Sequence, residues 1–397
     1  MTGKPWRAAS DGRKIRVVYL GHVAQLSGGE IALLRLIDAV GEEVDAHVIL
    51  AEQGPLVDRL RAAGVSVEVL AMRERTRNMR KDHVRPGRLP ISAFVDTATY
   101  VVRLASRLRG IHPDLVHTNT LKSGIYGSIA ARLARVPVVW HVRDRIASDY
   151  LRRPAVLLIR GLIATLPAGV IANSEATRAT LWRTRGDTRV VYSLVRDPVS
   201  WQPGRQYPAR DGRFVVGMVG RIAPWKGQDV FLKAFTRAFG AGEEGALIVG
   251  SAMFGEDEVR FGDALHQLAG ALAIADRVEF AGFREDVWAE LARMNMLVHA
   301  SVTPEPFGQV IVEAMLAGVP VIACAGGGPS EIITDGVDGL LYPAGDVVAL
   351  ADAMQRVRRD EDLRERLRNN GRTRAEQFSP RASASSVMAL YEEVLRR

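Results

Sequence analysis

The sequence contains very little cysteine, and this excludes several kinds of protein. Cys324 is the only cysteine among 397 residues, so neither an intramolecular disulfide nor a cysteine-rich metal site can form. A single cysteine is compatible with a reducing cytoplasm, and we expect a cytoplasmic protein.

Long hydrophobic runs are also missing. The most apolar stretch, residues 155–172, is interrupted by Arg160 and Pro167 and falls short of a membrane span. Residues 1–11 carry charge without an apolar core, unlike a secretory signal. We therefore expect a soluble protein, with peripheral contact at the inner face of the cell membrane as the remaining form of membrane association.

The net charge of +8 is unevenly distributed. Between Arg73 and Arg88 there are seven basic residues against Glu74 and Asp82, which gives this segment a net charge of 7 − 2 = +5. The segment lacks interleaved aromatic residues and any nucleic-acid recognition motif, so we expect no nucleic-acid partner. A solvated loop, an anionic acceptor and an acidic membrane surface remain as interpretations.

Short apolar runs alternate with segments of helical spacing along the chain, which predicts an α/β protein with parallel sheets covered by helices on both faces. In the first half the predicted strands are Lys14–Leu20, Ala46–Ala51, Val65–Leu70, Leu115–Thr118, Val138–Val142 and Gly169–Ala172. In the second half they are Phe214–Val219, Ala246–Val249, Val278–Phe280, Met296–Ala300 and Val319–Ala323. A helix is expected over Ser174–Trp182.

A proline-rich, weakly apolar stretch divides the two halves, as expected of a linker. A chain of this length is also too long for one ordinary core. We predict an N-terminal Rossmann-like domain over residues 1–195, a linker over 196–213, a C-terminal Rossmann-like domain over 214–378 and a terminal helix over 379–397.

Two motifs in the second half have complementary chemistry. Arg221 and Lys226 follow the predicted strand Phe214–Val219 and supply cations that can bind phosphates. Glu305 and Glu313, eight positions apart, supply carboxylates that can bind hydroxyls. A nucleotide-diphosphate sugar presents both kinds of group.

Together these motifs resemble the retaining family-4 glycosyltransferases of the GT-B fold, the glycosyl transferases group 1. The similarity is strongest from Val215 to Tyr342, and the turn Gly327-Gly328-Pro329-Ser330-Glu331 resembles the Gly-Gly-x-x-Glu turn of that family. The resemblance implies two doubly wound parallel-sheet domains facing each other across a cleft, with the C-terminal helix crossing back to the first domain. It also implies that the first domain binds the acceptor and the second binds the nucleotide sugar.

The implied activity is retaining transfer of a hexose or N-acetylhexosamine from a nucleotide-diphosphate sugar, with a UDP-sugar favoured over a GDP-sugar. The acceptor would be a hydroxyl of a small metabolite, a glycolipid or a growing polysaccharide. No cofactor is expected, because the nucleotide sugar is a co-substrate. No Asp-x-Asp cluster follows a predicted strand, since Asp360-Glu361-Asp362 lies in a charged helical stretch, so transfer is expected to be metal-independent.

The resemblance assigns roles to individual residues of both halves. Glu305, Arg221 and Lys226 are the expected catalytic residues. The expected donor-binding residues are Gly29, Phe283, Arg284, Phe307, Gly308, Gln309, Val310 and Glu313.

Contacts with the acceptor or the sugar are expected in the first half, after predicted strands. The candidates are Gly28, Glu30, His117, Asn119, His141 and Arg143. Relatives carry a histidine near the end of the strand at 138–142, and either His141 or Arg143 matches that position. If Arg143 takes it, the side chain there can stabilise an anion but cannot act as a base, because a guanidinium stays protonated at neutral pH.

Other functions are compatible with the same architecture. A nucleotide-sugar 2-epimerase would convert the donor without an acceptor, and a binding-only relative would have lost part of the site. A sugar phosphorylase would need a pyridoxal cofactor and a much longer chain. Retention of both cations and both glutamates favours transfer.

Overall fold

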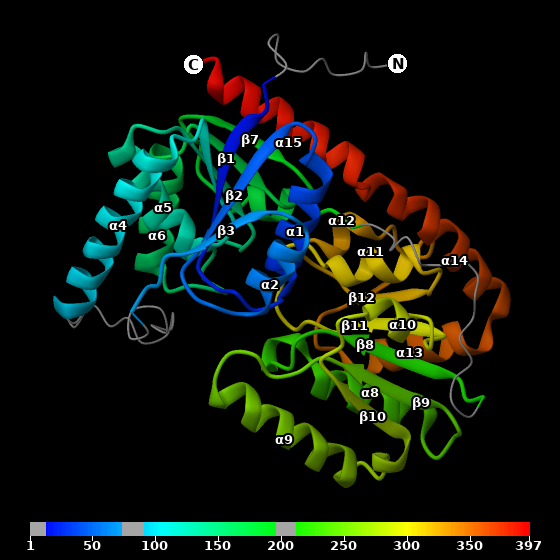
Figure 1. The fold of residues 1–397 in the computed structure, drawn as a ribbon. Coiled ribbons are helices and arrows are strands. Elements are labelled where there is room, and N and C mark those ends of the chain that lie inside the picture. Colours follow the sequence, from blue (N-terminus) through cyan, green and yellow to red (C-terminus); the bar gives the residue numbers. More distant parts are fainter. Residues whose placement is uncertain (1–12, 74–90, 196–211) are drawn as a thin grey trace. The chain divides into compact units, whose positions relative to one another are not determined.

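The computed structural model describes residues 13–73, 91–195 and 212–397 of the chain. The chain divides into two compact units, Met1–Leu194 with Pro380–Arg397, and Val195–Ser379 (Figure 1). Most of the predicted linker at 196–213 and of the basic segment at 73–88 lies outside the described residues.

The first unit is built on a parallel sheet of seven strands in the order β3-β2-β1-β4-β5-β6-β7. The strands are β1 (Ile15–Gly21), β2 (Val44–Leu50), β3 (Ser66–Val69), β4 (Leu115–Thr118), β5 (Val138–Val142), β6 (Gly169–Ala172) and β7 (Asp187–Val190). The first six match the predicted runs. The edge strand β7 was not predicted, because its sequence DTRV is polar and only half-buried.

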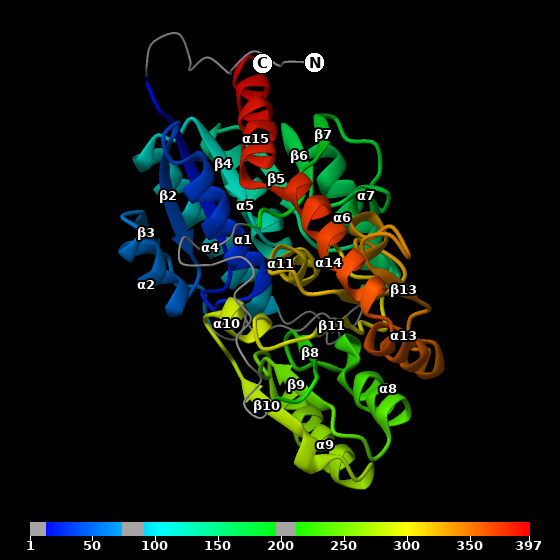
Figure 2. The ribbon, with the colours of Figure 1, turned by 90° about the vertical axis from the view of Figure 1, so that its right-hand side faces the viewer.

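Helices cover both faces of this sheet (Figure 2). They are α1 (Gly28–Val40), α2 (Pro55–Ala62), α4 (Ile91–Ile111), α5 (Leu121–Ala134), α6 (Arg153–Thr165), α7 (Glu175–Arg178) and α15 (Pro380–Leu395). Successive residues of a strand point to opposite faces. Accordingly Val138 packs in the core beneath α4 and α5, Val139 packs with residues of α1 and α15, and Trp140 packs with residues of α6.

Two sequence predictions about helices have different outcomes. The helix predicted over Ser174–Trp182 is shorter in the structure, where α7 keeps one turn, Glu175–Arg178. The predicted return of the C-terminal helix is confirmed, since α15 belongs to the first unit and contacts α1, β6 and β7. Its Leu390 and Tyr391 are fully buried there.

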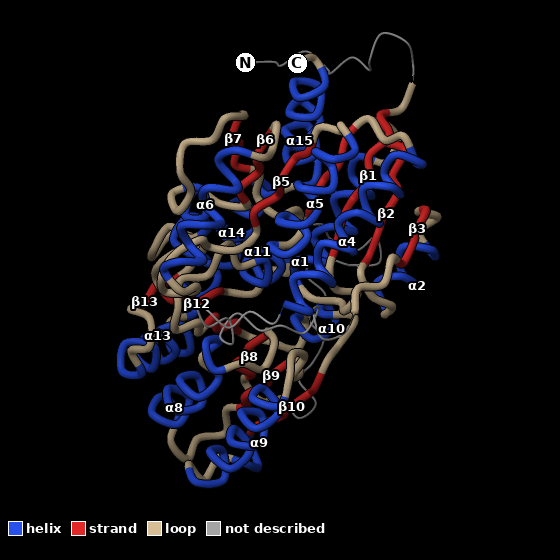
Figure 3. The backbone as a smooth tube through the Cα atoms, turned by 90° about the vertical axis from the view of Figure 1, so that its left-hand side faces the viewer, coloured by secondary structure: helices blue, strands red, loops and turns tan. Residues whose placement is uncertain are grey.

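The second unit contains a parallel sheet of six strands in the order β10-β9-β8-β11-β12-β13 (Figure 3). Its strands are β8 (Val215–Val219), β9 (Gly245–Val249), β10 (Val278–Gly282), β11 (Met296–His299), β12 (Val321–Cys324) and β13 (Leu340–Tyr342). Its α-helices are α8 (Gln228–Phe239), α9 (Glu256–Ala271), α10 (Val287–Leu291), α11 (Gln309–Leu316), α12 (Pro329–Ile332), α13 (Val347–Arg359) and α14 (Glu361–Ala375). Three 3₁₀ turns accompany them, η2 (Pro224–Lys226), η3 (Ala275–Arg277) and η4 (Glu376–Phe378). The three-residue strand β13 was not predicted.

The strand order reverses once in each sheet, between β1 and β4 in the first unit and between β8 and β11 in the second. At such a switch point the loops from the carboxyl ends of the two strands diverge, and ligands of open α/β sheets bind in the crevice between them. The residues singled out from the sequence follow these strands. Within the described residues, no helix is both long and apolar enough to cross a bilayer.

Candidate active site

Lys226 and Glu305 form a buried ion pair at the switch point of the second sheet. Lys226 belongs to η2, after β8, and Glu305 lies between β11 and α11. Lys226 Nζ donates to both carboxylate oxygens, at 2.7 Å and 3.0 Å. The side chains are only 15% and 12% exposed, so each charge depends on its neighbours for compensation.

Glu305 remains ionised despite its burial. Burial alone would raise the pKa of its carboxyl, but the charge of Lys226 and a hydrogen bond from His299 lower that pKa well below its ordinary value. Ser301 Oγ donates a further hydrogen bond to Glu305 Oε2 at 2.7 Å. The carboxylate is therefore fixed by donors on more than one side.

His299, at the end of β11, lies next to the carboxylate of Glu305. Its Nε2 is 3.4 Å from Glu305 Oε2, and its Nδ1 is 3.5 Å from Cys324 Sγ. Burial would lower the pKa of His299, but its contacts with Cys324 and Glu305 raise the pKa to about 9. The imidazole is therefore a cation at neutral pH.

The glycine turn after β12 fixes the backbone of Glu305. Glu305 forms an isolated parallel bridge with Gly327, and the N–H of Gly328 donates to Glu305 O at 2.8 Å. Gly327 has a φ of 66°, and a Cβ there would lie 2.2 Å from Glu305 O. A side chain at this position would displace the loop that carries the carboxylate.

Arg221 and Lys226 both lie close to the aromatic ring of Trp225. Arg221 Cζ is 5.5 Å and Lys226 Nζ 4.4 Å from the centroid of Trp225. Arg221 Nε also lies 3.4 Å from Glu258 Oε1, and Gln228 Nε2 donates to Arg221 O at 2.8 Å. The ring of Trp225 thus lies near two cations, consistent with a packing role.

The start of α11 follows Glu305 closely. Gly308 precedes the helix in the left-handed region, with a φ of 104°, and Gln309 and Val310 begin the first turn. Glu313 lies in the second turn and is 8% exposed. Phe307 is buried against Phe378, so only its backbone is available to a ligand.

Phe283 and Arg284 lie apart from this cluster. They follow β10, three strand positions from β11, which corresponds to about 14 Å at the usual strand spacing. Phe283 is 42% exposed, while Arg284 Nε donates to Glu290 Oε1 at 3.0 Å. A ligand that contacts both the loop after β10 and the Lys226–Glu305 pair must therefore be extended.

The first unit brings its predicted residues together at its own switch point. Asn119 Nδ2 donates to Gly29 O at 3.0 Å, and Arg143 Nε donates to Asn119 Oδ1 at 2.8 Å. Gly28 and Gly29 begin α1, and Glu30 is buried in its first turn. These contacts connect the loops that follow β1, β4 and β5.

The tautomer of His141 follows from Arg143. A guanidinium can only donate, and Arg143 Nη2 lies 3.3 Å from His141 Nδ1, so this nitrogen is an acceptor. His117 Nε2 lies 3.2 Å from the same atom and must also donate. His117 Nδ1 is then left to accept from Tyr391 Oη of α15 at 2.7 Å.

Both histidines are neutral in this arrangement. Burial, followed by the charge of Arg143, lowers the pKa of His117 to about 3 and that of His141 well below its ordinary value. The proton of His141 is on Nε2, which has no hydrogen-bond partner among the described residues. His141 therefore has no lone pair free to act as a base, although it keeps a histidine at the strand end.

Glu30 and Arg143 carry the remaining charge of the first-unit cluster. Burial raises the pKa of Glu30 to about 7, and Ser27 Oγ donates to its carboxyl. Burial lowers the pKa of Arg143 to about 10, so its guanidinium is still charged at neutral pH.

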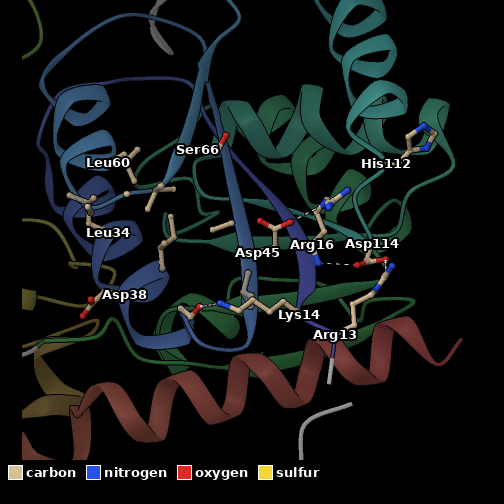
Figure 4. A pocket seen from close by; sticks show the side chains of 17 residues that line it. Arg13, Lys14, Arg16, Leu34, Asp38, Asp45, Leu60, Ser66, His112 and Asp114 are labelled. Atoms are coloured by element: carbon tan, nitrogen blue, oxygen red, sulfur yellow. Dashed lines mark hydrogen bonds and ion pairs between the residues drawn. The ribbon is translucent and has the colours of Figure 1, made fainter. Parts of the chain in front are cut away.

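A cavity of about 590 Å³ lies elsewhere in the first unit, at the amino ends of its strands (Figure 4). Arg13 forms an ion pair with Asp114 and Arg16 forms one with Asp45, while the backbone N–H of Arg16 donates to Asp114 Oδ2. It contains none of the residues predicted from the sequence. We therefore assign the candidate site to the switch points.

Sequence reasoning missed several members of these clusters. His299 and Ser301 lie within or just after an apolar run, Gln228 begins a helix, and Tyr391 lies far away in the chain. A histidine at the end of an otherwise apolar strand was the available signal for His299. Among the residues that the structure describes, no group of three or more His, Cys, Asp or Glu side chains could hold a metal ion.

Known protein families match both halves of the chain. The family described as glycosyl transferases group 1 matches residues 202–374, and the glycosyl transferase 4-like domain matches residues 27–193. D-inositol 3-phosphate glycosyltransferase of Stackebrandtia nassauensis is 32% identical over 308 residues, which cover 72% of this chain and 69% of that protein. GDP-mannose-dependent alpha-mannosyltransferase of Mycobacterium tuberculosis is 31% identical, over 67% of this chain and 71% of that protein. The crystal structure of Anabaena HepE in complex with UDP-glucose has a TM-score of 0.80 at 26% identity, covering 96% of this chain and 100% of that one.

The neutral histidines predict a loss of stability in acid. Unfolded imidazoles bind protons below a pKa of about 6.5, whereas folded His117 and His141 do not, so the free energy of unfolding should fall as pH decreases below 6.5. Each histidine contributes up to about 1.4 kcal/mol per pH unit. Glu30 acts in the opposite sense between its ordinary pKa and 7. Urea unfolding from pH 7 to pH 4.5 in a Glu30→Gln background measures this fall without the opposing contribution of Glu30.

Nitrogen-15 NMR of the imidazoles provides the direct check. Both should remain neutral at pH 5, with the proton of His141 on Nε2, and His141→Asn assigns its signal. Protonation of either ring near pH 6.5 would contradict the prediction.

Proposed function

The chain belongs to the glycosyl transferases group 1, and on that premise we propose that it moves a hexose or N-acetylhexosamine from a UDP-sugar to an acceptor hydroxyl with retention of configuration. The observation that carries this proposal is the placement of Arg221, Lys226 and Glu305 at the switch point of the second sheet. Two cations suit a diphosphate, and a fixed carboxylate suits a sugar.

Residues along the carboxyl edge of the second sheet are proposed to bind the donor. Arg221 and Lys226 would bind the diphosphate, and the backbone of residues 307–310 would add N–H donors at the start of α11. Glu313 would bind the ribose hydroxyls, and the loop at Phe283 and Arg284 would hold the base.

Among known proteins, the complex of Anabaena HepE with UDP-glucose favours a UDP-sugar. The mannosyltransferase of Mycobacterium tuberculosis is GDP-mannose-dependent, so GDP-sugars are the competing class of donor. A donor screen by thermal shift with both classes distinguishes them.

In the transfer step, the bond between the anomeric carbon and the diphosphate oxygen breaks, and a bond to the acceptor oxygen forms on the same face. The acceptor proton goes to a phosphate oxygen of the departing diphosphate. Arg221 and Lys226 stabilise the charge that develops there, and Glu305 positions the sugar and stabilises the oxocarbenium-like state. No protein base is required, in agreement with the neutral His141.

Acceptor contacts are proposed for the first-unit cluster, namely Gly28, Glu30, His117, Asn119, His141 and Arg143, with Gly29 toward the donor. Arg143 and Asn119 offer donors suited to hydroxyl or anionic groups. Small metabolites, glycolipids and polysaccharides are the acceptor classes to try. Incubating the donor without an acceptor tests for the epimerase alternative.

The first prediction here is that Lys226→Ala or Arg221→Ala lowers turnover by about 10²–10³, because each variant removes a donor to the departing diphosphate. Nucleoside diphosphate release measures turnover, and thermal melting checks that the variants fold. Lys233→Ala, on the exposed face of α8, is the matched control. Wild-type turnover in both site variants would remove the phosphate-binding assignment.

Metal independence gives a second prediction. Activity should survive thorough treatment with EDTA, since Arg221 and Lys226 supply the charge that a divalent cation would otherwise supply. The same assay with excess magnesium or manganese is the control. Loss with EDTA and recovery with either metal would overturn this part of the proposal.

We also propose peripheral contact with an anionic membrane, through the outer surface of α5 and α6. Ile129, Leu133, Leu157 and Leu158 are 37%, 48%, 57% and 63% exposed there. Trp182, 45% exposed, lies against Gly161 of α6. The two helices contain four basic residues and no acidic residue. Exposed apolar side chains beside unbalanced positive charge suit an acidic lipid surface.

Vesicle co-sedimentation tests this surface. Binding to phosphatidylglycerol vesicles should exceed binding to phosphatidylcholine vesicles and weaken with salt, because surface charge is screened over about 8 Å at physiological ionic strength. Replacing both Leu157 and Leu158 with serine should reduce binding, whereas Val259→Ser, at a similarly exposed residue of α9, should not. Equal binding by the two variants would contradict the proposal.

A further inference from the structure

His299 is a buried titratable residue to which the proposed function gives no role. Its side chain is 3% exposed at the carboxyl end of β11. Both ring nitrogens face a partner, Nε2 toward Glu305 Oε2 at 3.4 Å and Nδ1 toward Cys324 Sγ at 3.5 Å. Ser301 Oγ is close to both Glu305 and His299, at 2.7 Å from Glu305 Oε2 and 3.4 Å from His299 Nε2.

The geometry creates a problem of charge compensation. A carboxylate as buried as that of Glu305 needs a cation close by. In the structure Lys226 supplies it, and the proposed function also assigns Lys226 to the donor diphosphate. As Lys226 turns toward a phosphate, the carboxylate loses part of its compensation at the moment when its position matters.

We propose that His299 is a positioning residue, an imidazolium that keeps Glu305 ionised and correctly oriented while Lys226 binds the donor diphosphate. This inference rests on the proposed function, since it concerns the same carboxylate. Ser301 supports it as a neutral donor, and Cys324 holds the far side of the ring.

The groups around the ring favour the charged form. The titratable side chains that face it are Glu305 from the loop before α11 and Cys324 from β12, with Lys226 beyond Glu305 and Tyr342 of β13 beyond Cys324. The contacts with Cys324 and Glu305 outweigh burial and raise the pKa of His299 to about 9. Its charge is therefore present at neutral pH and is lost as pH rises through about 9.

Nitrogen-15 NMR of the ligand-free protein tests the charge without any activity. The imidazole of His299, assigned with His299→Gln, should be protonated at pH 7 and should titrate near pH 9. A ring that is neutral at pH 7 would overturn the inference, whatever the protein transfers. Absence of activity with every nucleotide sugar would overturn the proposed function instead.

Kinetics test the positioning role. His299→Gln should lower kcat by about 10²-fold, the order expected when a reacting group is misplaced, and leave donor binding within about threefold, because Arg221 and Lys226 are intact. The fall in wild-type kcat above pH 9 should be absent from this variant. His112→Asn, an exposed histidine of the first unit, is the matched control.

A double-mutant cycle separates this role from a purely structural one. In a Glu305→Gln background, His299→Gln should cost little more activity, because the imidazolium acts through the carboxylate. Fully additive losses would overturn the inference. If His299→Gln fails to fold, Ser301→Ala keeps the imidazole together with both contacts that raise its pKa, and the ring should still be protonated at pH 7.

Discussion

The buried contact between Lys226 and Glu305 is the constraint on which the chemistry of the second unit depends. Removing two charges from water costs several kcal/mol per ion, so the pair can persist only with good geometry and additional hydrogen bonds. Ser301 and His299 supply those bonds, and the turn at Gly327 fixes the backbone. These contacts fix the carboxylate of Glu305, which limits its own reorganisation during transfer.

The first unit handles charge in a different way. His117 and His141 are neutral there, and the guanidinium of Arg143 and the hydroxyl of Tyr391 set their tautomers. Tyr391 lies on α15, so the C-terminal helix contributes to the polar network of this unit as well as to its core. Besides packing against the first unit, α15 therefore also determines which hydrogen-bonding groups His117 and His141 can present.

Much of the fold could be predicted from the sequence, because buried parallel strands appear as apolar runs. The exceptions have physical causes. β7 is a half-buried edge strand without an apolar run, β13 is three residues long, and the segment after Ser174 keeps only one helical turn. The proposed roles of Arg221, Lys226 and Glu305 came from spacing and resemblance, and Lys226 contacts Glu305 because β8 and β11 are neighbours in the sheet.

Other parts of the site could not be predicted, because they depend on tertiary contacts between distant residues. Nothing near His117 in the sequence indicates Tyr391, 274 positions away. His299 was included in an apolar strand, and only the register of β11 with β12 places it beside Cys324.

The contrast between the two clusters has a mechanistic consequence. Cations in the second unit suit an anionic leaving group, whereas the neutral rings of the first unit can donate hydrogen bonds but do not remove a proton at neutral pH. Glu305 is also a poor base, because the factors that keep it ionised lower its proton affinity. With both His141 and Glu305 unsuited to accept the acceptor proton, the proposed reaction transfers that proton to an oxygen of the departing diphosphate. Retention of configuration is consistent with this chemistry, because a leaving group that takes the proton must be on the same face of the sugar as the incoming hydroxyl.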